Sequence, residues 1–187
     1  ISSPISTLPV ATDFDHIQRL LPTRDAHWLE LGCGAAITTR RLAEAFTTVR
    51  ITAMEVDEIQ HRKNLQIRDL PNVRFVFGGA QAIDLPDTSV DAVIMLKSLH
   101  HVPRDAMAEA MAEIARVLKP GGQAYVSEPV YAGDFNDILR LFNDEQVVEK
   151  IAEVVGEVRE RWPVKKVAAI HRVGELRVGE ISVVVAV

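Results

Sequence analysis

Hydrophobic residues along the chain fall into two kinds of pattern that alternate from the N-terminal region onwards. One kind is a short, almost continuous apolar run, which predicts a strand buried on both faces of a parallel sheet. The other is an apolar stripe at helical spacing, which predicts an amphipathic helix. The runs that predict strands are 27–31, 49–56, 73–77, 90–96 and 123–127. Alternation of this kind favours an α/β fold with a doubly wound parallel sheet.

The predicted helices lie between these strands. A short first helix precedes them, with Thr12 or Asp13 as its N-cap and Pro22 as its end. Two more helices are expected at 37–46 and at about 57–69. Pro103 suits the first position of a fourth helix, whose apolar stripe runs to Leu118. The Lys-Pro-Gly-Gly stretch at 119–122 is expected to end that helix and turn the chain into the fifth strand.

The C-terminal part continues the pattern with different elements. An amphipathic helix is predicted from Gln146 to near Trp162, and two β-rich runs follow at 164–171 and 180–187. Those runs suit an antiparallel pair. The expected architecture is therefore Rossmann-like, with a seven-stranded sheet of five parallel strands and a C-terminal antiparallel pair. At 187 residues the chain is expected to form a single domain, 1–187.

A glycine-rich turn follows the first predicted strand. The stretch from Trp28 to Ala36 reads W-L-E-L-G-C-G-A-A, with Glu30 inside the strand and two glycines around Cys33. Glycine lacks a Cβ, so such a turn admits a ligand against bare backbone. The second strand ends in an acid, Glu55. A strand, glycine turn, helix and second strand ending in acid form the βαβ plan of nucleotide-binding sites.

Composition narrows the classes of partner. The formal net charge of −5 and pI near 5.7 argue against a broad nucleic-acid-binding face or an anionic membrane contact. A single cysteine excludes a disulfide framework within the chain, so a reducing, cytoplasmic setting is expected. No apolar run has the length of a membrane span, and no His/Cys/Asp set has zinc spacing. We therefore expect small-molecule or protein partners and no metal.

Five motifs in order make the pattern specific. They are L-E-L-G-C-G-A-A, M-E-V-D, I-D-L-P-D-T-S-V-D-A-V, L-H-H-V-P and R-V-L-K-P-G-G. This combination resembles class I S-adenosylmethionine-dependent methyltransferases of the small-molecule type, over residues of about 14–143. The resemblance implies S-adenosyl-L-methionine as the cofactor and methyl transfer to a small-molecule acceptor. The chain lacks the third glycine of G-x-G-x-x-G, which disfavours a nicotinamide-dependent dehydrogenase.

The resemblance also implies a set of cofactor contacts. Glu30 would accept hydrogen bonds from the cofactor ammonium, and Gly32 and Gly34 would let the loop lie close to it. Glu55, followed by Val56, would accept the ribose hydroxyls. Counting back from Leu85-Pro86, Gln81 takes the place of the family's usual Asp, with Ala82 and Ile83 beside it; a shift in register would bring in Asp84 instead. Leu96 and Lys97 match the position that closes over the cofactor, although Lys97 also suits a helix cap or a surface charge.

Catalytic residues are less defined. His100 and His101 follow the fourth strand, where the methyl acceptor lies in this family, and either one suits a substrate-orienting or proton-accepting role. Tyr131 and Glu128 follow the fifth strand and are further candidates. Methyl transfer from a sulfonium needs mainly in-line positioning in a desolvated site, so a dedicated base is not required.

The C-terminal stretch has a second resemblance. Residues of about 149–187 are similar to an internal piece of the large subunit of molybdopterin synthase. We therefore hypothesise a chain of two origins joined between about Asp144 and Lys150, with convergence of valine-rich hairpins as the alternative. A recombined or engineered scaffold that binds cofactor without turnover is the alternative to an active methyltransferase.

Overall fold

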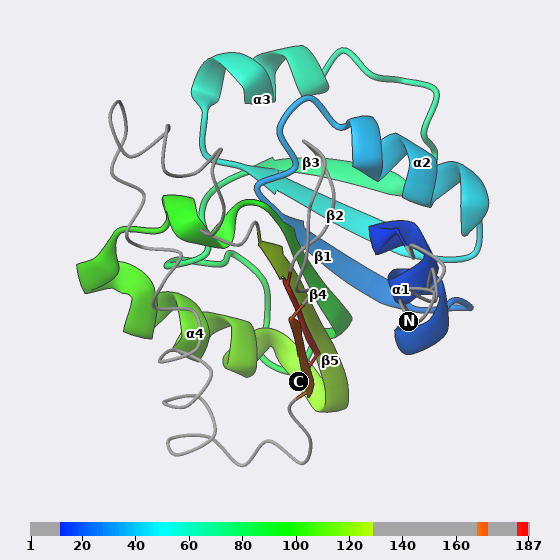
Figure 1. Ribbon diagram of the computed structural model, residues 1–187. Coiled ribbons are helices and arrows are strands. Elements are labelled where there is room, and N and C mark those ends of the chain that lie inside the picture. Colours follow the sequence, from blue (N-terminus) through cyan, green and yellow to red (C-terminus); the bar gives the residue numbers. More distant parts are fainter. Residues whose placement is uncertain (1–11, 129–167, 172–182, 187) are drawn as a thin grey trace, which may run out of the picture.

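The computed structural model describes residues 12–128, 168–171 and 183–186, and its strands form one sheet with helices on both faces (Figure 1). The parallel strands are β1 (His27–Leu31), β2 (Arg50–Glu55), β3 (Val73–Phe77), β4 (Val90–Leu96) and β5 (Leu118–Glu128). They are ordered β3-β2-β1-β4-β5. The chain thus winds outward in both directions from β1, which confirms the predicted α/β, Rossmann-like fold with five parallel strands.

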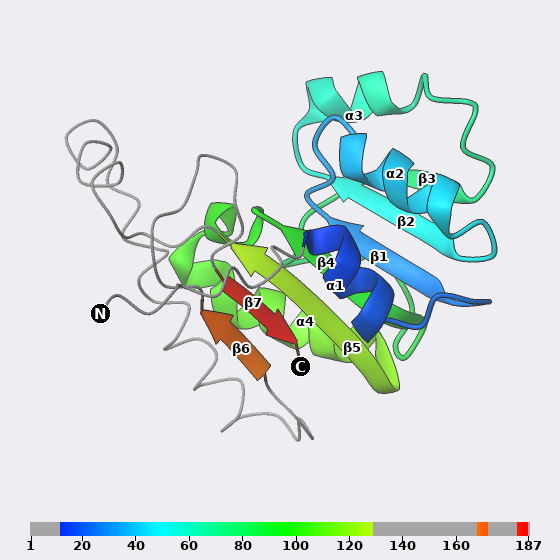
Figure 2. The same cartoon turned by 45° about the vertical axis from the view of Figure 1, so that its right-hand side comes forward.

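Two short strands lie beyond β5. They are β6 (Ala168–His171) and β7 (Val183–Ala186), and Figure 2 shows them beside β5. β7 runs antiparallel to β5, with Tyr125 opposite Ala186, and β6 runs antiparallel to β7. The remainder of the predicted strands 164–171 and 180–187, the predicted helix from Gln146, the proposed junction and Tyr131 lie outside the described residues.

The helices divide between the two faces of the sheet. On one face α1 (Asp13–Leu20) and α2 (Ile37–Ala45) pack over a core that includes Trp28, Ile94 and Tyr125. On the other, α4 (Met107–Val117) packs over Leu29, Val93 and Met95. Helix α3 (Glu58–Asn64) contacts β2 and β3. The strands are therefore covered on both faces, as their continuous apolar runs predict.

Local chemistry explains where these helices begin. Thr12 caps α1: its hydroxyl oxygen accepts from Asp15 N–H, and the Asp15 carboxylate accepts from Thr12 N–H at 2.7 Å. This resolves the choice between Thr12 and Asp13. Asp57 caps α3, accepting from Gln60 N–H at 2.7 Å. The last helical residue of α3 is Asn64, so the predicted helix to about residue 69 is too long.

Two further predictions about local structure are wrong. Pro103 is not the first residue of the α-helix. It lies between two 3₁₀ turns, η1 (Leu99–His101) and η2 (Arg104–Ala106), and α4 begins only after η2. The Lys-Pro-Gly-Gly stretch is not a separate turn but part of β5. The ladder with β4 shifts register there, between Val90 and Ala92, and Gly121 takes a φ of +83°. A β-bulge therefore absorbs the proline and glycines without ending the strand.

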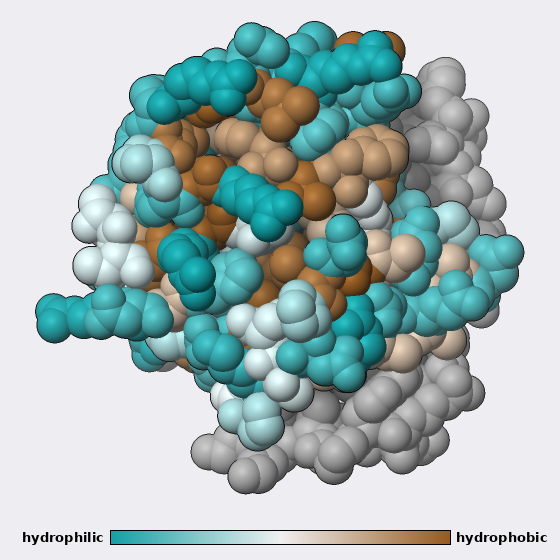
Figure 3. All heavy atoms as spheres, turned by 180° about the vertical axis from the view of Figure 1, so that it is seen from behind, coloured by the Kyte–Doolittle hydropathy of each residue, from teal (hydrophilic) through white to brown (hydrophobic). Residues whose placement is uncertain are grey.

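Some apolar side chains remain on the surface. Figure 3, seen from the side opposite to Figure 1, shows apolar residues gathered across the middle of that face with hydrophilic residues around and among them. Among the residues whose side chains are described, the large exposed hydrophobic ones are Leu20, Ile37, Val56, Ile59, Leu65 and Phe77. In the described part of the chain, no helix has both the length and the apolar character needed to cross a membrane.

Candidate functional site

The glycine turn joins β1 to α2 at the carboxyl edge of the sheet. Its first residues are tied to the neighbouring strand, since Gly32 N–H and Cys33 N–H both donate to Met54 O, at 2.9 and 3.0 Å. Gly32 has a φ of +75°, and a Cβ there would lie 2.6 Å from Ser98 Cβ. Ser98 is itself held, because its hydroxyl donates to Leu31 O at 2.7 Å. Gly32 is therefore required by close packing against the end of β4.

Gly34 differs from Gly32 in what surrounds it. Its φ is +51°, and a Cβ at this position would meet no heavy atom of the described residues within 4 Å. The turn is held from the opposite side by Asn64, a buried residue of α3 whose amide donates to Gly34 O at 2.8 Å. Asn64 could not be recognised as a site residue from the sequence, because its bond spans 30 residues. Gly34 is thus fixed in place, and among the described residues nothing packs against the side where a Cβ would stand.

Glu55 links the end of β2 to this turn. One carboxylate oxygen accepts from Gly34 N–H at 2.6 Å, and the other accepts from Val56 N–H and Asp57 N–H, both at 2.9 Å. Its side chain is buried. Main-chain donors therefore hold the carboxylate at the carboxyl edge of the sheet, where an acid at the end of the second strand contacts ribose in dinucleotide sites.

Glu30 is a buried acid in the middle of the sheet, on the face covered by α2. It is 3% exposed, and Thr39 Oγ1 donates to its Oε2 at 2.7 Å. Burial raises the pKa of Glu30 from 4.5 to about 7, against the smaller lowering effect of the Thr39 hydroxyl. Burial, with Glu30 and Glu55 nearby, also raises the pKa of Cys33 to about 12. That thiol stays protonated, which excludes it as a nucleophile at neutral pH.

The raised pKa of Glu30 gives a testable pH dependence. Below pH 4.5 the carboxyl is neutral in both folded and unfolded chains, but between 4.5 and about 7 only the unfolded chain ionises freely. Raising the pH through this window should therefore lower the free energy of unfolding of the ligand-free protein by about 3 kcal/mol relative to Glu30→Gln. Denaturant titrations of both proteins from pH 4 to 8 measure this difference, and a constant difference across the range would contradict it.

The segment after β3 contains the residues predicted to contact adenine. Gln81 and Ala82 are exposed, and Ala82 N–H donates to Gly79 O at 3.2 Å. A Cβ on Gly79 would lie 2.7 Å from Gln81 Oε1 and 2.9 Å from Val56 Cγ1, so these two side chains converge over the glycine. Val56 is 57% exposed, whereas Ile83 is 4% exposed and packs in the core. Val56 and Ala82 therefore supply the exposed apolar side chains of this group, and Asp84 is also exposed.

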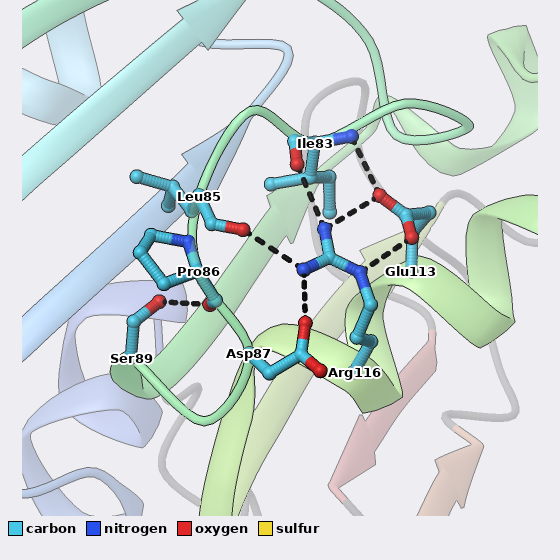
Figure 4. A network of polar contacts seen from close by, with 7 residues as sticks. All are labelled: Ile83, Leu85, Pro86, Asp87, Ser89, Glu113 and Arg116. Atoms are coloured by element: carbon cyan, nitrogen blue, oxygen red, sulfur yellow. Dashed lines mark hydrogen bonds and ion pairs between the residues drawn. The ribbon is translucent and has the colours of Figure 1, made fainter.

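Arg116 of α4 holds the segment that follows. Figure 4 shows its guanidinium donating to Ile83 O at 2.8 Å, to Leu85 O at 2.9 Å and to the Asp87 carboxylate at 2.7 Å. Glu113 accepts from the same guanidinium and also from Ile83 N–H at 2.9 Å. The Arg116 hydrogen bonds lower the pKa of Glu113 to about 2. Both main-chain groups of Ile83 are therefore fixed by α4, a role that sequence analysis did not predict.

The end of β4 carries the next two predicted residues. Leu96 is half-buried and packs against the core beneath α1. Lys97 is exposed with a φ of +56°, and its ammonium lies 2.9 Å from the Asp13 carboxylate. Tyr125 O–H donates to the other oxygen of Asp13 at 3.0 Å. Lys97 thus ties the start of α1 to the carboxyl end of β4, which is compatible with its predicted position near the cofactor.

Of the catalytic candidates, the structure brings His100 and Glu128 together. Glu128, the last residue of β5, is 1% exposed; its Oε1 accepts from Leu99 N–H at 2.7 Å, and its Oε2 lies 2.5 Å from His100 Nδ1. His101 is exposed, with its ring centroid 4.0 Å from that of His100. Within 12–128 and the two short C-terminal strands, no group of three or more His, Cys, Asp or Glu residues is arranged to hold a metal ion.

Comparison with protein families gives two matches. Residues 29–122, half of the chain, match the family described as "Methyltransferase domain". Residues 139–187 match the family described as "MoaE protein". The two matches do not overlap, and the predicted junction near 144–150 lies close to the start of the second. The match at the C-terminus supports the suggestion of a chain with two origins.

Individual relatives point to the same family as the first match. An uncharacterized methyltransferase of Mycobacterium tuberculosis is 37% identical over 107 residues, which cover 57% of this chain and 41% of that protein. The 27-O-demethylrifamycin SV methyltransferase of Amycolatopsis mediterranei is 31% identical, over 75% of this chain and 50% of that protein. The chain thus matches half or less of each relative's length. A Methanosarcina mazei structure described as a SAM-dependent methyltransferase has a TM-score of 0.68 at 19% identity, covering 91% of this chain and 94% of that one.

Proposed function

Because the chain belongs to the family of methyltransferase domains, we propose that it binds S-adenosyl-L-methionine at the glycine turn and transfers the methyl group to a small-molecule acceptor. The observation that carries this proposal is the contrast between the two glycines. Gly32 is blocked by Ser98, whereas a Cβ on Gly34 would meet none of the described residues, and Gly34 N–H donates to Glu55. Two buried acids, Glu30 before the turn and Glu55 bonded to it, suit a ligand with an ammonium and a ribose.

Each protein group has a defined part in holding the cofactor. The Glu30 carboxylate suits the ammonium, because a cation beside a desolvated acid favours its ionised form. Glu55 has lone pairs beyond those used by three main-chain donors and suits the ribose hydroxyls. Gln81 and Ala82 are assigned to the adenine side together with Val56, while Ile83, which packs in the core, fixes this segment to α4; Leu96 and Lys97 are assigned to the other side. When bound, S-adenosylmethionine supplies an electrophilic methyl group on a sulfonium.

The acceptor is proposed to lie over the carboxyl ends of β4 and β5. Ser98, which packs against Gly32, is followed directly by Leu99, His100 and His101, so the turn and the two histidines share one edge of the sheet. The Amycolatopsis relative is named for a small molecule that carries a hydroxyl where the product carries a methoxy group. A small-molecule acceptor is therefore our proposal for this chain as well.

Calorimetry of the full chain tests the cofactor assignment. S-adenosylhomocysteine, the product form of the cofactor, is expected to bind with one site per chain, and NAD⁺ is expected not to bind, because the acid at Glu30 repels a pyrophosphate. Absence of S-adenosylhomocysteine binding would contradict the proposal. Binding without methyl transfer to any acceptor would favour the alternative of a scaffold that folds without turnover.

We further propose that the C-terminal segment, despite its MoaE-like sequence, completes the sheet as a seven-stranded one. The support is the main-chain pairing of β5 with β7 over Tyr125–Glu128 and of β7 with β6. A chain ending at residue 145 would expose this edge of β5 and is expected to lose cooperative thermal unfolding. Unchanged stability and S-adenosylhomocysteine affinity in that shortened chain would show that the segment is dispensable.

A further inference from the structure

The side-chain amide of Gln81 lies beside the end of β2. A Cβ on Gly79 would lie 2.7 Å from Gln81 Oε1 and 2.9 Å from Val56 Cγ1, so the amide and the valine side chain meet over a residue that has no side chain. Val56 directly follows Glu55, the acid assigned to the ribose. The amide of Gln81 is therefore placed next to the residue that follows the proposed ribose contact.

The two main-chain N–H groups that follow this glutamine are engaged within the protein. Ala82 N–H donates to Gly79 O at 3.2 Å, and Ile83 N–H donates to Glu113 Oε2 at 2.9 Å. Arg116 donates to the same Glu113 oxygen and to Ile83 O, both at 2.8 Å, so α4 holds this part of the segment (Figure 4). Because these two donors already have acceptors, a base on this segment is read by a side chain and not by them.

An amide can bond to a base in two ways. It carries an accepting oxygen and a donating NH₂ group, and rotation by half a turn about the last side-chain bond exchanges them. Gln81 is exposed, so core packing does not restrict this rotation. A carboxylate at the same place would only accept. Adenine presents an amino donor at position 6 and hypoxanthine presents an oxo acceptor there, and the amide therefore has a matching group for each.

The other side chains assigned to the base do not distinguish these two substituents. Val56 is 57% exposed, and Ala82 is exposed as well. Both are apolar, and apolar contacts depend on the area that is covered and not on the pattern of donors and acceptors. Discrimination between the two bases on this side of the site is therefore left to Gln81.

We propose that Gln81 sets the base specificity of the site and lets it accept a cofactor with a 6-oxopurine as well as one with adenine, an inference that rests on the proposed methyltransferase function. With adenine, the amide oxygen accepts from the 6-amino group. With hypoxanthine, the amide NH₂ donates to the 6-oxo group. Neither complex leaves the polar group at position 6 unpaired, which would otherwise lower the affinity.

Calorimetry of the full chain compares S-adenosylhomocysteine with S-inosylhomocysteine, which carry an amino and an oxo group at position 6. The two dissociation constants of the unmutated chain are expected to agree within about tenfold. Gln81→Glu keeps the size of the side chain but removes its donor. In this variant S-inosylhomocysteine should bind at least about tenfold more weakly relative to S-adenosylhomocysteine, because two acceptors then face each other. Thermal unfolding checks that the variant, changed at an exposed position, keeps its Tm.

Two further variants show whether the effect belongs to Gln81. Gln66 is exposed just after α3, and Gln66→Glu should leave the ratio of the two affinities unchanged. Asp84→Asn changes the exposed acid of the same segment and should also leave it unchanged. A difference above about tenfold between the ligands in the unmutated chain, an unchanged ratio in Gln81→Glu, or an equal shift in either of the other variants overturns the inference. Failure of the unmutated chain to bind S-adenosylhomocysteine instead rejects the proposed function.

Discussion

Replacing Glu55 with glutamine is expected to weaken S-adenosylhomocysteine binding roughly 100-fold, as the loss of one or two charge-assisted hydrogen bonds predicts. The carboxylate accepts from Gly34 N–H with one oxygen and from Val56 and Asp57 with the other. An amide retains only one accepting atom, so it cannot hold the glycine turn and the end of β2 together while also meeting the ribose. Calorimetry of the purified variant measures the change.

A nearby acid provides a control for the Glu55 variant. Glu58 begins α3 and pairs with Arg62 on the surface, where their side chains are 64% and 70% exposed. Glu58→Gln removes the same charge close to the same strand end, and is expected to leave the affinity within about threefold because an exposed pair contributes little. Equal affinities for the Glu55 and Glu58 variants would show that Glu55 does not bind the ligand.

The two glycines of the turn are expected to respond oppositely to alanine. Gly32→Ala should destabilise the protein by about 3 kcal/mol, because the new Cβ meets Ser98 at 2.6 Å and the φ of +75° is strained for alanine. The Cβ of Gly34→Ala meets no atom of the described residues within 4 Å and should cost only about 1 kcal/mol, yet it fills the space assigned to the cofactor. Its S-adenosylhomocysteine affinity should fall at least about tenfold.

Thermal unfolding and calorimetry on both glycine variants separate the two effects. The expected outcome is a large drop in Tm for Gly32→Ala and a small drop in Tm with impaired binding for Gly34→Ala. If Gly34→Ala binds S-adenosylhomocysteine as the unmutated chain does, the space beside Gly34 is not the cofactor site.

The strands and the main acids of the site were accessible from sequence because they depend on local pattern. A buried parallel strand has a continuous apolar run, so β1, β2, β3 and β4 were recognisable, and the acid at the end of β2 could be placed at the carboxyl edge. Gly32 and Gly34 were correctly located in the turn. Their different surroundings were not predictable, since the neighbour of Gly32 is Ser98, which lies 66 residues further along the chain.

The missed residues have their contacts far away in sequence. Asn64 anchors Gly34 across 30 residues, and Arg116 fixes Ile83 across 33. As polar residues on helices, both resembled ordinary surface positions, and only tertiary packing brings them to the site. Pro103 was misassigned for a related reason: the chain between β4 and α4 forms 3₁₀ turns, in which Leu99 N–H is bound by Glu128 of another strand.

A crystal structure of the full chain with S-adenosylhomocysteine tests the central claim most directly. The expected result places the ammonium of the ligand beside Glu30, its amino-acid part against Gly34 and its ribose hydroxyls on Glu55. A ligand bound away from the turn between β1 and α2, or a ribose without contact to Glu55, would contradict the assignment of this edge of the sheet as a methyltransferase cofactor site.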